Sequence, residues 1–201
     1  MKWGVYRWIE GQTATAERIN DMCDVAARLA GFLIALHRID TAGGPAPGAH
    51  NFHRGGSLAV YDAEARGAIT LLGGDIDVAR ARRTWETALE SKWIKAPVWV
   101  HGDIAPGNLL LVDGRLNAVI DFGSMAIGDP ACDLSIAWTL FRGESRHLFR
   151  QTLGLHEQIW ARGRAWTLWK ALIVAAKLAQ TNAIEMQRPL EVIEEVLAEY
   201  R

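Results

Sequence analysis

The chain has 201 residues, 50% of them hydrophobic, and its 22 basic residues nearly balance its 23 acidic ones. This composition is typical of one soluble domain with a sizeable core, and it argues against a disordered, collagen-like or membrane-spanning chain. Because the net charge is close to zero, no overall field attracts nucleic acid or an anionic membrane, so neither is expected as a partner.

The N-terminus and the cysteines predict a cytoplasmic protein. The first residues, MKWGVYRWIEG, have neither the apolar segment nor the small-residue cleavage site of a signal peptide. The longest apolar run, residues 171–179, is interrupted by Lys177 and is too short to span a bilayer. Cys23 and Cys132 lie in apolar helical patterns, away from disulfide-framework or metal-site spacing, so we predict reduced thiols that fill the core.

The first half of the chain is predicted to be mainly helical. Residues 5–8 are expected to form a short strand. Residues 41–56, with five glycines and two prolines, are expected to form a long loop. Asp75 is a candidate N-cap for the helix that follows it. The segments with helical periodicity are residues 25–37, 61–72 and 75–93.

The periodicity changes in the middle of the chain. A short apolar run at residues 98–100 predicts a strand, and apolar segments on both sides of Asp113-Gly114 predict a β-hairpin, since Asp-Gly is favoured in a type I′ turn. Helical patterns return at residues 131–141, 145–153, 156–179 and 189–200. The sequence therefore predicts a mostly helical α+β domain with a small central β-hairpin insertion, and loops on such a scaffold often carry function.

Polar residues with catalytic spacing surround this hairpin. The predicted strand leads into His101 and Asp103, Asn108 precedes the hairpin, and Asp121 directly follows it in the triplet DFG. The pattern H-x-D-x-x-x-x-N followed by D-F-G is used by phosphotransferases of the protein-kinase type. That chemistry needs one carboxylate near the attacking hydroxyl, with an amide and a second carboxylate to hold Mg²⁺ against phosphates. Separately, Asp103 and Asp121 could be turn or capping residues, but the complete set in this order favours catalysis.

The segment VWVHGDIAPGNLLLVDGRLNAVIDFGSMAIGDPACDLSIAW resembles the core of the aminoglycoside phosphotransferase family, whose motif runs HGD, N, IDFG, GDP and DL. VYRWIEG, LAGFLIALHRID and HNFHRGG resemble the interlobe hinge, the helix after it and a loop of many bacterial members. The resemblance covers nearly the whole chain. It implies the C-terminal lobe of the protein-kinase-like fold as a single domain over residues 1–201, with a hinge-like segment at 1–11 and a catalytic and metal-binding core at 98–133.

The resemblance also implies an activity and roles for single residues. It implies ATP- and Mg²⁺-dependent transfer of the γ-phosphoryl group to a hydroxyl of a small polar substrate such as an aminoglycoside. By this similarity Asp103 is the general base, and Asn108 and Asp121 are Mg²⁺ ligands. At the hinge, Tyr6 and Trp8 are implied to lie near the nucleotide. The residues implied to support the catalytic loop are His101, Asp129 and Asp133.

Several polar residues have two open readings. Arg54 in HNFHRGG is a candidate contact for substrate or phosphate, although a loop arginine is more commonly solvated. His50 and His53 have a spacing that suits a metal, but no third ligand is evident. The acidic residues of the last predicted helix either form a solvated face or attract a polycationic aminoglycoside. They are Glu191, Glu194, Glu195 and Glu199.

The start of the sequence departs from the family pattern. In kinases of this type a complete lobe precedes the hinge and supplies a glycine-rich loop, a lysine and a glutamate. The hinge-like segment here begins at residue 5, so we expect the N-terminal lobe to be absent and activity to require it from elsewhere. The alternative is a catalytically impaired lobe that acts as a binding or regulatory module. We also expect a two-fold dimer, or docking of a separate N-lobe chain, through Val5, Tyr6, Trp8 and Ile9.

Overall fold

The computed structural model describes residues 7–179 and 188–199, which form a mixed helix and strand fold. The helices are α1 (Met22–His37), α2 (Asp62–Leu71), α3 (Val78–Glu90), α4 (Ile136–Thr139), α5 (Gly143–Leu153), α6 (Glu157–Ala175) and α8 (Pro189–Ala198). The strands are β1 (Gln12–Thr13), β2 (Val98–Val100), β3 (Leu109–Val112), β4 (Arg115–Val119) and β5 (Ala126–Gly128). Within the described ranges, none of the helices combines the length and hydropathy needed to cross a membrane.

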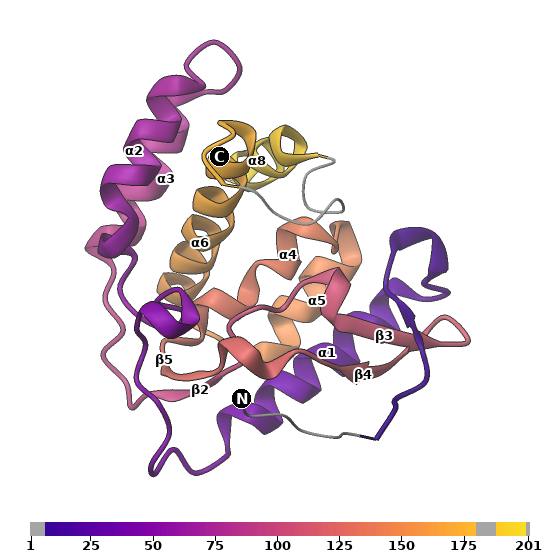
Figure 1. Cartoon of the computed structure of the whole chain (residues 1–201). Helices are drawn as coiled ribbons and strands as arrows, with labels where there is room; N and C mark the ends of the chain where they lie inside the picture. The colour runs from indigo at the N-terminus through magenta and orange to yellow at the C-terminus, as the bar shows by residue number, and fades with distance from the viewer. Residues whose placement is uncertain (1–6, 180–187, 200–201) are drawn as a thin grey trace, which may run out of the picture.

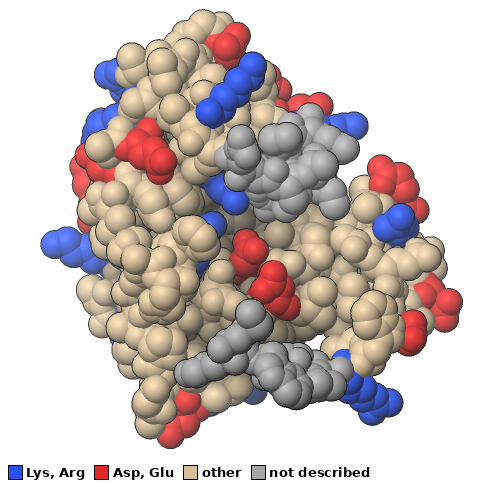
Figure 2. All heavy atoms as spheres, in the orientation of Figure 1, with Lys and Arg blue, Asp and Glu red and all other residues tan. Residues whose placement is uncertain are grey.

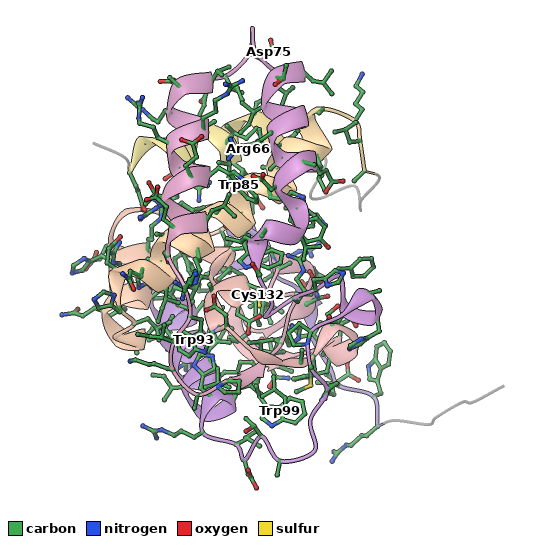
Figure 3. The ribbon with its side chains drawn as sticks, turned by 90° about the vertical axis from the view of Figure 1, so that its left-hand side faces the viewer. Arg66, Asp75, Trp85, Trp93, Trp99 and Cys132 are labelled. Atoms are coloured by element: carbon green, nitrogen blue, oxygen red, sulfur yellow. The ribbon has the colours of Figure 1, made fainter. Side chains whose placement is uncertain are left out.

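Helix α6 organises the packing. It contacts α2, α3, α8 and the 3₁₀ segment Pro130–Leu134, while α1 packs against α5 and against strands β2 and β4 (Figure 1). Helices α2 and α3 run side by side away from the rest of the fold, and Asp75 lies in the turn at their outer end (Figure 3). The prediction that Asp75 caps this helix is wrong. Asp77 is the N-cap and accepts from the Arg80 backbone N–H at 2.9 Å, so α3 begins at Val78.

The strands form two small antiparallel sheets, with the orders β1-β3-β4 and β2-β5. The predicted hairpin is confirmed: β3 pairs with β4, and Asp113 and Gly114 have φ of 48° and 70°, as a type I′ turn requires. The strand expected at residues 5–8 is wrong for Arg7 and Trp8, which have no strand structure, and its first half lies outside the described residues. The first strand is instead β1, because pairing with β3 of the hairpin sets its position.

Two helix boundaries also differ from prediction. Residues 131–141 do not form one helix: a 3₁₀ turn, whose N-cap Asp129 accepts from the Ala131 N–H at 3.1 Å, precedes α4. Helix α6 ends at Ala175 rather than at residue 179, because Lys177 has a left-handed φ of 57° and the chain turns back there.

The core is rich in tryptophan. Trp85, Trp138, Trp160 and Trp166 are fully buried. Cys132 is buried as expected, close to the centre of the fold (Figure 3), but Cys23 is only half-buried. Near the N-terminus, 79% of Trp8 and 45% of Ile9 is exposed. Tyr6, the other predicted hinge residue, and Val5 lie outside the described residues.

Candidate active site

A buried carboxylate holds the loop that follows β2. The backbone N–H groups of His101 and Gly102 donate to the two Asp133 oxygens at 2.8 and 2.7 Å. Asp133 is fully buried; this burial raises the pKa of its carboxyl, whereas the N–H donors favour its charged form. On the opposite side, Gly102 has φ 82°, and an added Cβ would lie 2.3 Å from the Ser124 carbonyl oxygen. The start of the loop is therefore fixed between Asp133 and the segment after β4.

Both ring nitrogens of His101 are engaged. Nδ1 accepts from the Asp103 backbone N–H at 3.2 Å, and Nε2 lies 3.0 Å from the Ile120 carbonyl oxygen. Because Nδ1 accepts, Nε2 carries the proton and donates to Ile120. The imidazole, packed 4.8 Å from the Phe122 ring, thus ties the Asp103 loop to the strand end that carries Asp121. This environment suits a positioning role better than proton transfer.

The Asn108 side chain is hydrogen-bonded to Asp103. Its Nδ2 donates to the Asp103 carbonyl at 2.8 Å and to the Asp103 Oδ2 at 3.1 Å, and both residues are half-buried. These bonds leave the amide oxygen of Asn108 without a described donor. The Asn108 carbonyl also accepts from the Ile120 N–H at 2.9 Å, so Asp121 follows a residue that contacts Asn108 directly. Asp103 and Asn108 are therefore in direct contact, and Asp121 directly follows the Ile120 backbone that contacts Asn108.

Asp121 is exposed and has an unusual backbone. Its φ and ψ are 64° and 66°, in the left-handed region, and its Oδ1 accepts from the Gly123 N–H at 3.4 Å. A non-glycine residue in this region carries backbone strain, and such residues cluster at functional sites. In the described ranges, no group of three or more His, Cys, Asp or Glu side chains is arranged to hold a metal, so His50 and His53 gain no third such ligand there.

The turn Gly128-Asp129-Pro130, called the GDP turn from its sequence letters, is joined to α6 by a buried ion pair. Arg162 Nε lies 2.5 Å from Asp129 Oδ2, with side-chain exposures of only 6% and 7%. Arg162 also donates to the Ser91 hydroxyl, just beyond α3. The sequence analysis missed Arg162. A cation on the almost entirely buried helix α6 was the available signal, because a buried arginine needs a carboxylate partner.

The loop before α2 packs directly on this site. The buried Asn51 amide donates to the Arg54 carbonyl at 3.0 Å and to the Ser124 carbonyl at 3.3 Å. The Gly55 carbonyl accepts from the Asp129 N–H at 2.8 Å. The HNFHRGG segment is therefore part of the scaffold that holds the GDP turn and the segment after Asp121.

We expect Gly128→Ala to lower the free energy of unfolding by roughly 1–3 kcal/mol, the usual cost of overpacking. The added Cβ would lie 2.1 Å from the Gly55 carbonyl oxygen, a backbone atom that cannot rotate away. Urea denaturation measures the effect. Gly67→Ala is the control: it lies inside α2 with nothing within 4 Å and should stabilise the protein slightly. Equal stability of the Gly128→Ala variant and the parent would show that the loop can move away.

A cavity of about 440 Å³ opens on one side of Asp103. Its walls come from the catalytic loop, α6, α8 and the segment around β1, and they include Arg54 and Cys132. Burial raises the pKa of the Cys132 thiol well above its ordinary value, so this residue is an inert part of the wall. Asn108 and Asp121 do not line the cavity. Asp103 thus lines a small-molecule-sized space and also contacts Asn108, one of the two predicted metal ligands.

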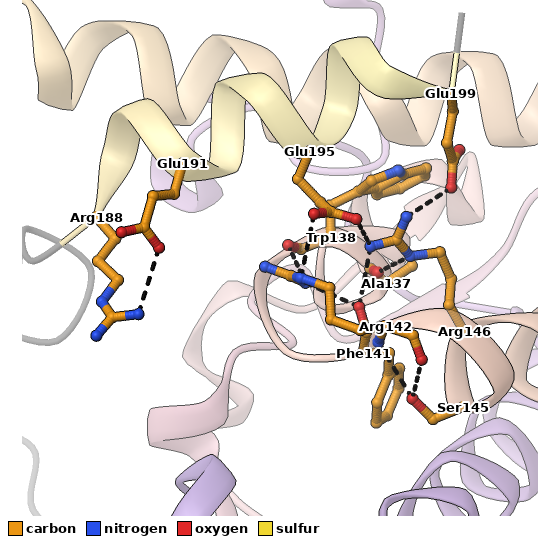
Figure 4. Close-up of polar contacts among 10 residues, drawn as sticks. All are labelled: Ala137, Trp138, Phe141, Arg142, Ser145, Arg146, Arg188, Glu191, Glu195 and Glu199. Carbon is orange, nitrogen blue, oxygen red and sulfur yellow. Dashed lines mark hydrogen bonds and ion pairs between the residues drawn. The ribbon is translucent and has the colours of Figure 1, made fainter. Parts of the chain in front are cut away.

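Two of the open readings are settled by side-chain placement. Arg54 is only 9% exposed, so the solvated reading is wrong. The carboxylates of α8 are mostly engaged in ion pairs (Figure 4). Glu195 and Glu199 pair with Arg146, and Glu191 pairs with Arg188 at 3.3 Å. Glu195 and Glu199 are thus tied to Arg146, whereas Glu191 and Glu194 are exposed, as the solvated reading expects.

Comparison with known proteins gives a consistent picture. A family model described as a phosphotransferase enzyme family matches residues 1–166. The GDP complex of aminoglycoside 2'-phosphotransferase-IIIa superposes with a TM-score of 0.61 at 17% identity, covering 98% of this chain and 70% of that one. The streptomycin and ATP ternary complex of APH(2")-IIa superposes with a TM-score of 0.53 at 18% identity, and the match covers 92% of this chain and 70% of that one. A macrolide 2'-phosphotransferase type I superposes with a TM-score of 0.54 at 18% identity, and the match covers 89% of this chain and 59% of that one. No curated protein matches in sequence. At these identities the structural likeness establishes the fold alone.

Proposed function

Since the chain belongs to the phosphotransferase enzyme family, we propose that it transfers the γ-phosphoryl group of a nucleoside triphosphate to a hydroxyl of a small molecule bound in the cavity. The observation that carries this proposal is the position of Asp103. Its residue lines the cavity, while its carboxylate accepts from Asn108, on the side where the strand carrying Asp121 ends. A hydroxyl in the cavity and a phosphate at the rim would thus meet at Asp103.

In the proposed step the substrate hydroxyl oxygen forms a bond to the γ-phosphorus as the bond from that phosphorus to the β–γ bridging oxygen breaks. The Asp103 carboxylate takes the hydroxyl proton, and the nucleoside diphosphate leaves. The Asn108 amide orients that carboxylate, and the His101 ring holds the Asp103 backbone by accepting from its N–H. Positioned proton acceptors of this kind contribute to rate only when they are held within hydrogen-bond reach of the hydroxyl.

The donor set at the rim fits Mg²⁺. Asp121 offers an exposed carboxylate and Asn108 an amide oxygen without a described donor, and hard cations take such oxygen ligands while keeping several waters. When bound there, Mg²⁺ would neutralise charge on the nucleotide phosphates. Asn108 and Asp121 would hold it, with Asp121 kept in place by its strained left-handed backbone.

We further propose that the phosphates need a second lobe, carried by the same polypeptide or by another. The described fold corresponds in this proposal to a C-terminal lobe, and a glycine-rich loop and a lysine elsewhere would complete the nucleotide site. Support comes from relatives of the same fold whose structures are complexes with GDP or ATP, and which extend beyond the part that this chain covers. Without that lobe, we expect MgATP to bind more weakly than about 1 μM.

Replacing Asp121 with asparagine tests the metal site. We expect Mg²⁺, or Mn²⁺ as its spectroscopic probe, to bind at least roughly tenfold more weakly, because even residues that only orient a metal ligand contribute this much. Calorimetry and Mn²⁺ paramagnetic resonance on the full chain measure the change. Asn tolerates the left-handed backbone, so the fold should be retained.

Asp113→Asn is the matched control, since Asp113 is also exposed and also has a positive φ, but lies in the hairpin turn. Its metal binding should equal that of the parent. If the two variants bind Mn²⁺ equally, Asp121 is not a metal ligand. That result would favour the alternative of a catalytically impaired lobe that acts as a binding or regulatory module.

A further inference from the structure

Arg54 is a buried cation that faces the cavity, and among the described residues it has no ion-pair partner. Its side chain is among the cavity walls together with Asp103, yet only 9% of the residue is exposed. No hydrogen bond or ion pair joins its guanidinium to any residue in the described ranges. A guanidinium presents several N–H donors in a fixed fork, and those of Arg54 can be reached from the cavity, since none is among the fully buried unpaired atoms of the described residues. The group is therefore prepared for an acceptor that is not part of the described chain.

The surroundings of Arg54 hold its charge without satisfying its donors. Its guanidinium carbon lies 5.1 Å from the Trp166 ring centre and 5.3 Å from that of Trp169. The faces of aromatic rings attract a cation but accept no strong hydrogen bond. From behind, the Asn51 amide fixes the Arg54 backbone through its carbonyl at 3.0 Å.

Asp133, the buried carboxylate whose charge Arg54 favours, already accepts two hydrogen bonds. Burial raises the pKa of Asp133, and the charge of Arg54 opposes that rise, so the two groups interact at a distance. Both Asp133 oxygens, however, accept the backbone N–H groups of His101 and Gly102. Arg54 thus favours the charged form of the anchoring carboxylate without a hydrogen bond to it.

The described cavity walls carry charges of both signs rather than an acidic surface. Of the described residues that line it, the acids are Glu17 and Asp103 and the bases are Arg54, Lys170 and Arg188. Of these bases, Arg188 pairs with Glu191 of α8, while Glu195 and Glu199 pair with Arg146 (Figure 4). Figure 2 shows red and blue side chains together within the hollow of this face, rather than an acidic surface.

The remaining walls are apolar or carry hydroxyls. Ile104, Leu140, Val174 and Val192 face the cavity, as do Ser135, Thr139 and Thr167. Such walls favour a compact ligand with an apolar body. A guanidinium fork binds a carboxylate or a phosphate in a two-pronged arrangement, which orients as well as attracts the ligand.

We propose that the acceptor substrate is a hydroxylated small molecule with an anionic group, a carboxylate or a phosphate, that binds Arg54 and so presents the hydroxyl to Asp103. This inference rests on the proposed phosphoryl transfer and narrows its substrate class. It departs from the aminoglycoside expectation, because an aminoglycoside would bring several positive charges next to Arg54. Arg54 acts here as a specificity-determining residue.

Calorimetric titration of the full chain without nucleotide tests the proposal. The probes are 4-hydroxyphenylacetate, 4-hydroxyphenyl phosphate and inorganic phosphate, with neutral 4-hydroxyphenylacetamide and cationic kanamycin for comparison. We expect the organic anions to bind saturably below about 50 mM. We expect neither the amide nor kanamycin to bind in that range. Phosphate alone would show whether the bare anion suffices, and the two organic anions show whether carboxylate or phosphate is preferred.

Variants assign the binding to Arg54. Arg54→Gln should weaken the anions roughly 10- to 100-fold, and Arg54→Lys, which keeps the charge without the fork, should weaken them less. Arg38→Gln, at the exposed end of α1 and outside the cavity, should bind as the parent does. Thermal unfolding shows whether each variant folds. If Arg54→Gln does not fold, the affinities of Arg54→Lys and the comparison of acid with amide in the parent still show whether the anion binds Arg54.

Three results would overturn the inference: no anion binds saturably, the amide binds as well as its acid, or Arg54→Gln binds as tightly as the parent. None of these results bears on phosphoryl transfer itself, because no nucleotide is present. Conversely, if the Asp121 and Asp103 variants keep metal binding and turnover, the proposed function fails even where the anions bind Arg54.

Discussion

Asp103→Asn is expected to lower phosphoryl-transfer turnover by roughly 10²- to 10⁴-fold, the usual contribution of a positioned general base. Asparagine keeps the shape and the backbone N–H that donates to His101, but its amide cannot take the hydroxyl proton. The Asn108 amide, which donates to the carboxylate at 3.1 Å in the parent, would still find an oxygen acceptor. Initial rates measure the effect, in a preparation that contains the nucleotide-gripping lobe.

The loss must lie in chemistry rather than in folding or binding. Thermal unfolding and the metal affinity of Asp103→Asn should match those of the parent, since Asp103 is half-buried and its role in the fold rests on its backbone. Asp113→Asn serves again as a control, with turnover unchanged. A turnover of Asp103→Asn within a few-fold of the parent would remove Asp103 from the mechanism.

The site could be predicted from sequence where its signals are local. His101, Asp103 and Asn108 lie within one loop, and Asp121 follows a hairpin whose Asp-Gly turn is one of the strongest short-range signals a sequence carries. The structure brings these residues together through the Ile120 backbone, which accepts from His101 and donates to Asn108. Local spacing was enough to group them, although not to assign these bonds.

What could not be predicted depends on contacts between distant segments. Strand β5 exists only because it pairs with β2, and nothing in residues 126–128 marks a strand alone. The burial of Arg54 follows from its packing on two tryptophans of α6, more than 100 residues later in the sequence. A loop arginine is exposed by default, so the sequence supported the wrong reading until tertiary packing was known.

The Asp129–Arg162 ion pair also joins segments that are distant in the sequence. Breaking it is expected to have the largest effect on stability. Arg162→Met should lower the free energy of unfolding by about 3–5 kcal/mol, because removing one partner leaves a buried charge uncompensated. Asp129 is 5% exposed, and apart from the Ala131 backbone its carboxylate contacts only Arg162 among the described residues. Methionine fills similar space on α6, so loss of packing adds little.

A second change separates charge from packing. Adding Asp129→Asn to Arg162→Met should recover part of the loss, since a neutral amide can still accept from the Ala131 N–H but leaves no buried charge. Arg28→Met, which breaks an exposed pair with Asp24 within α1, is the control and should leave unfolding nearly unchanged. Urea denaturation of the parent, Arg162→Met, Asp129→Asn and the double variant measures the four free energies of the cycle, and Arg28→Met is measured beside them. If the double variant were as unstable as the sum of the two single variants, the ion pair would not be what joins the GDP turn to α6.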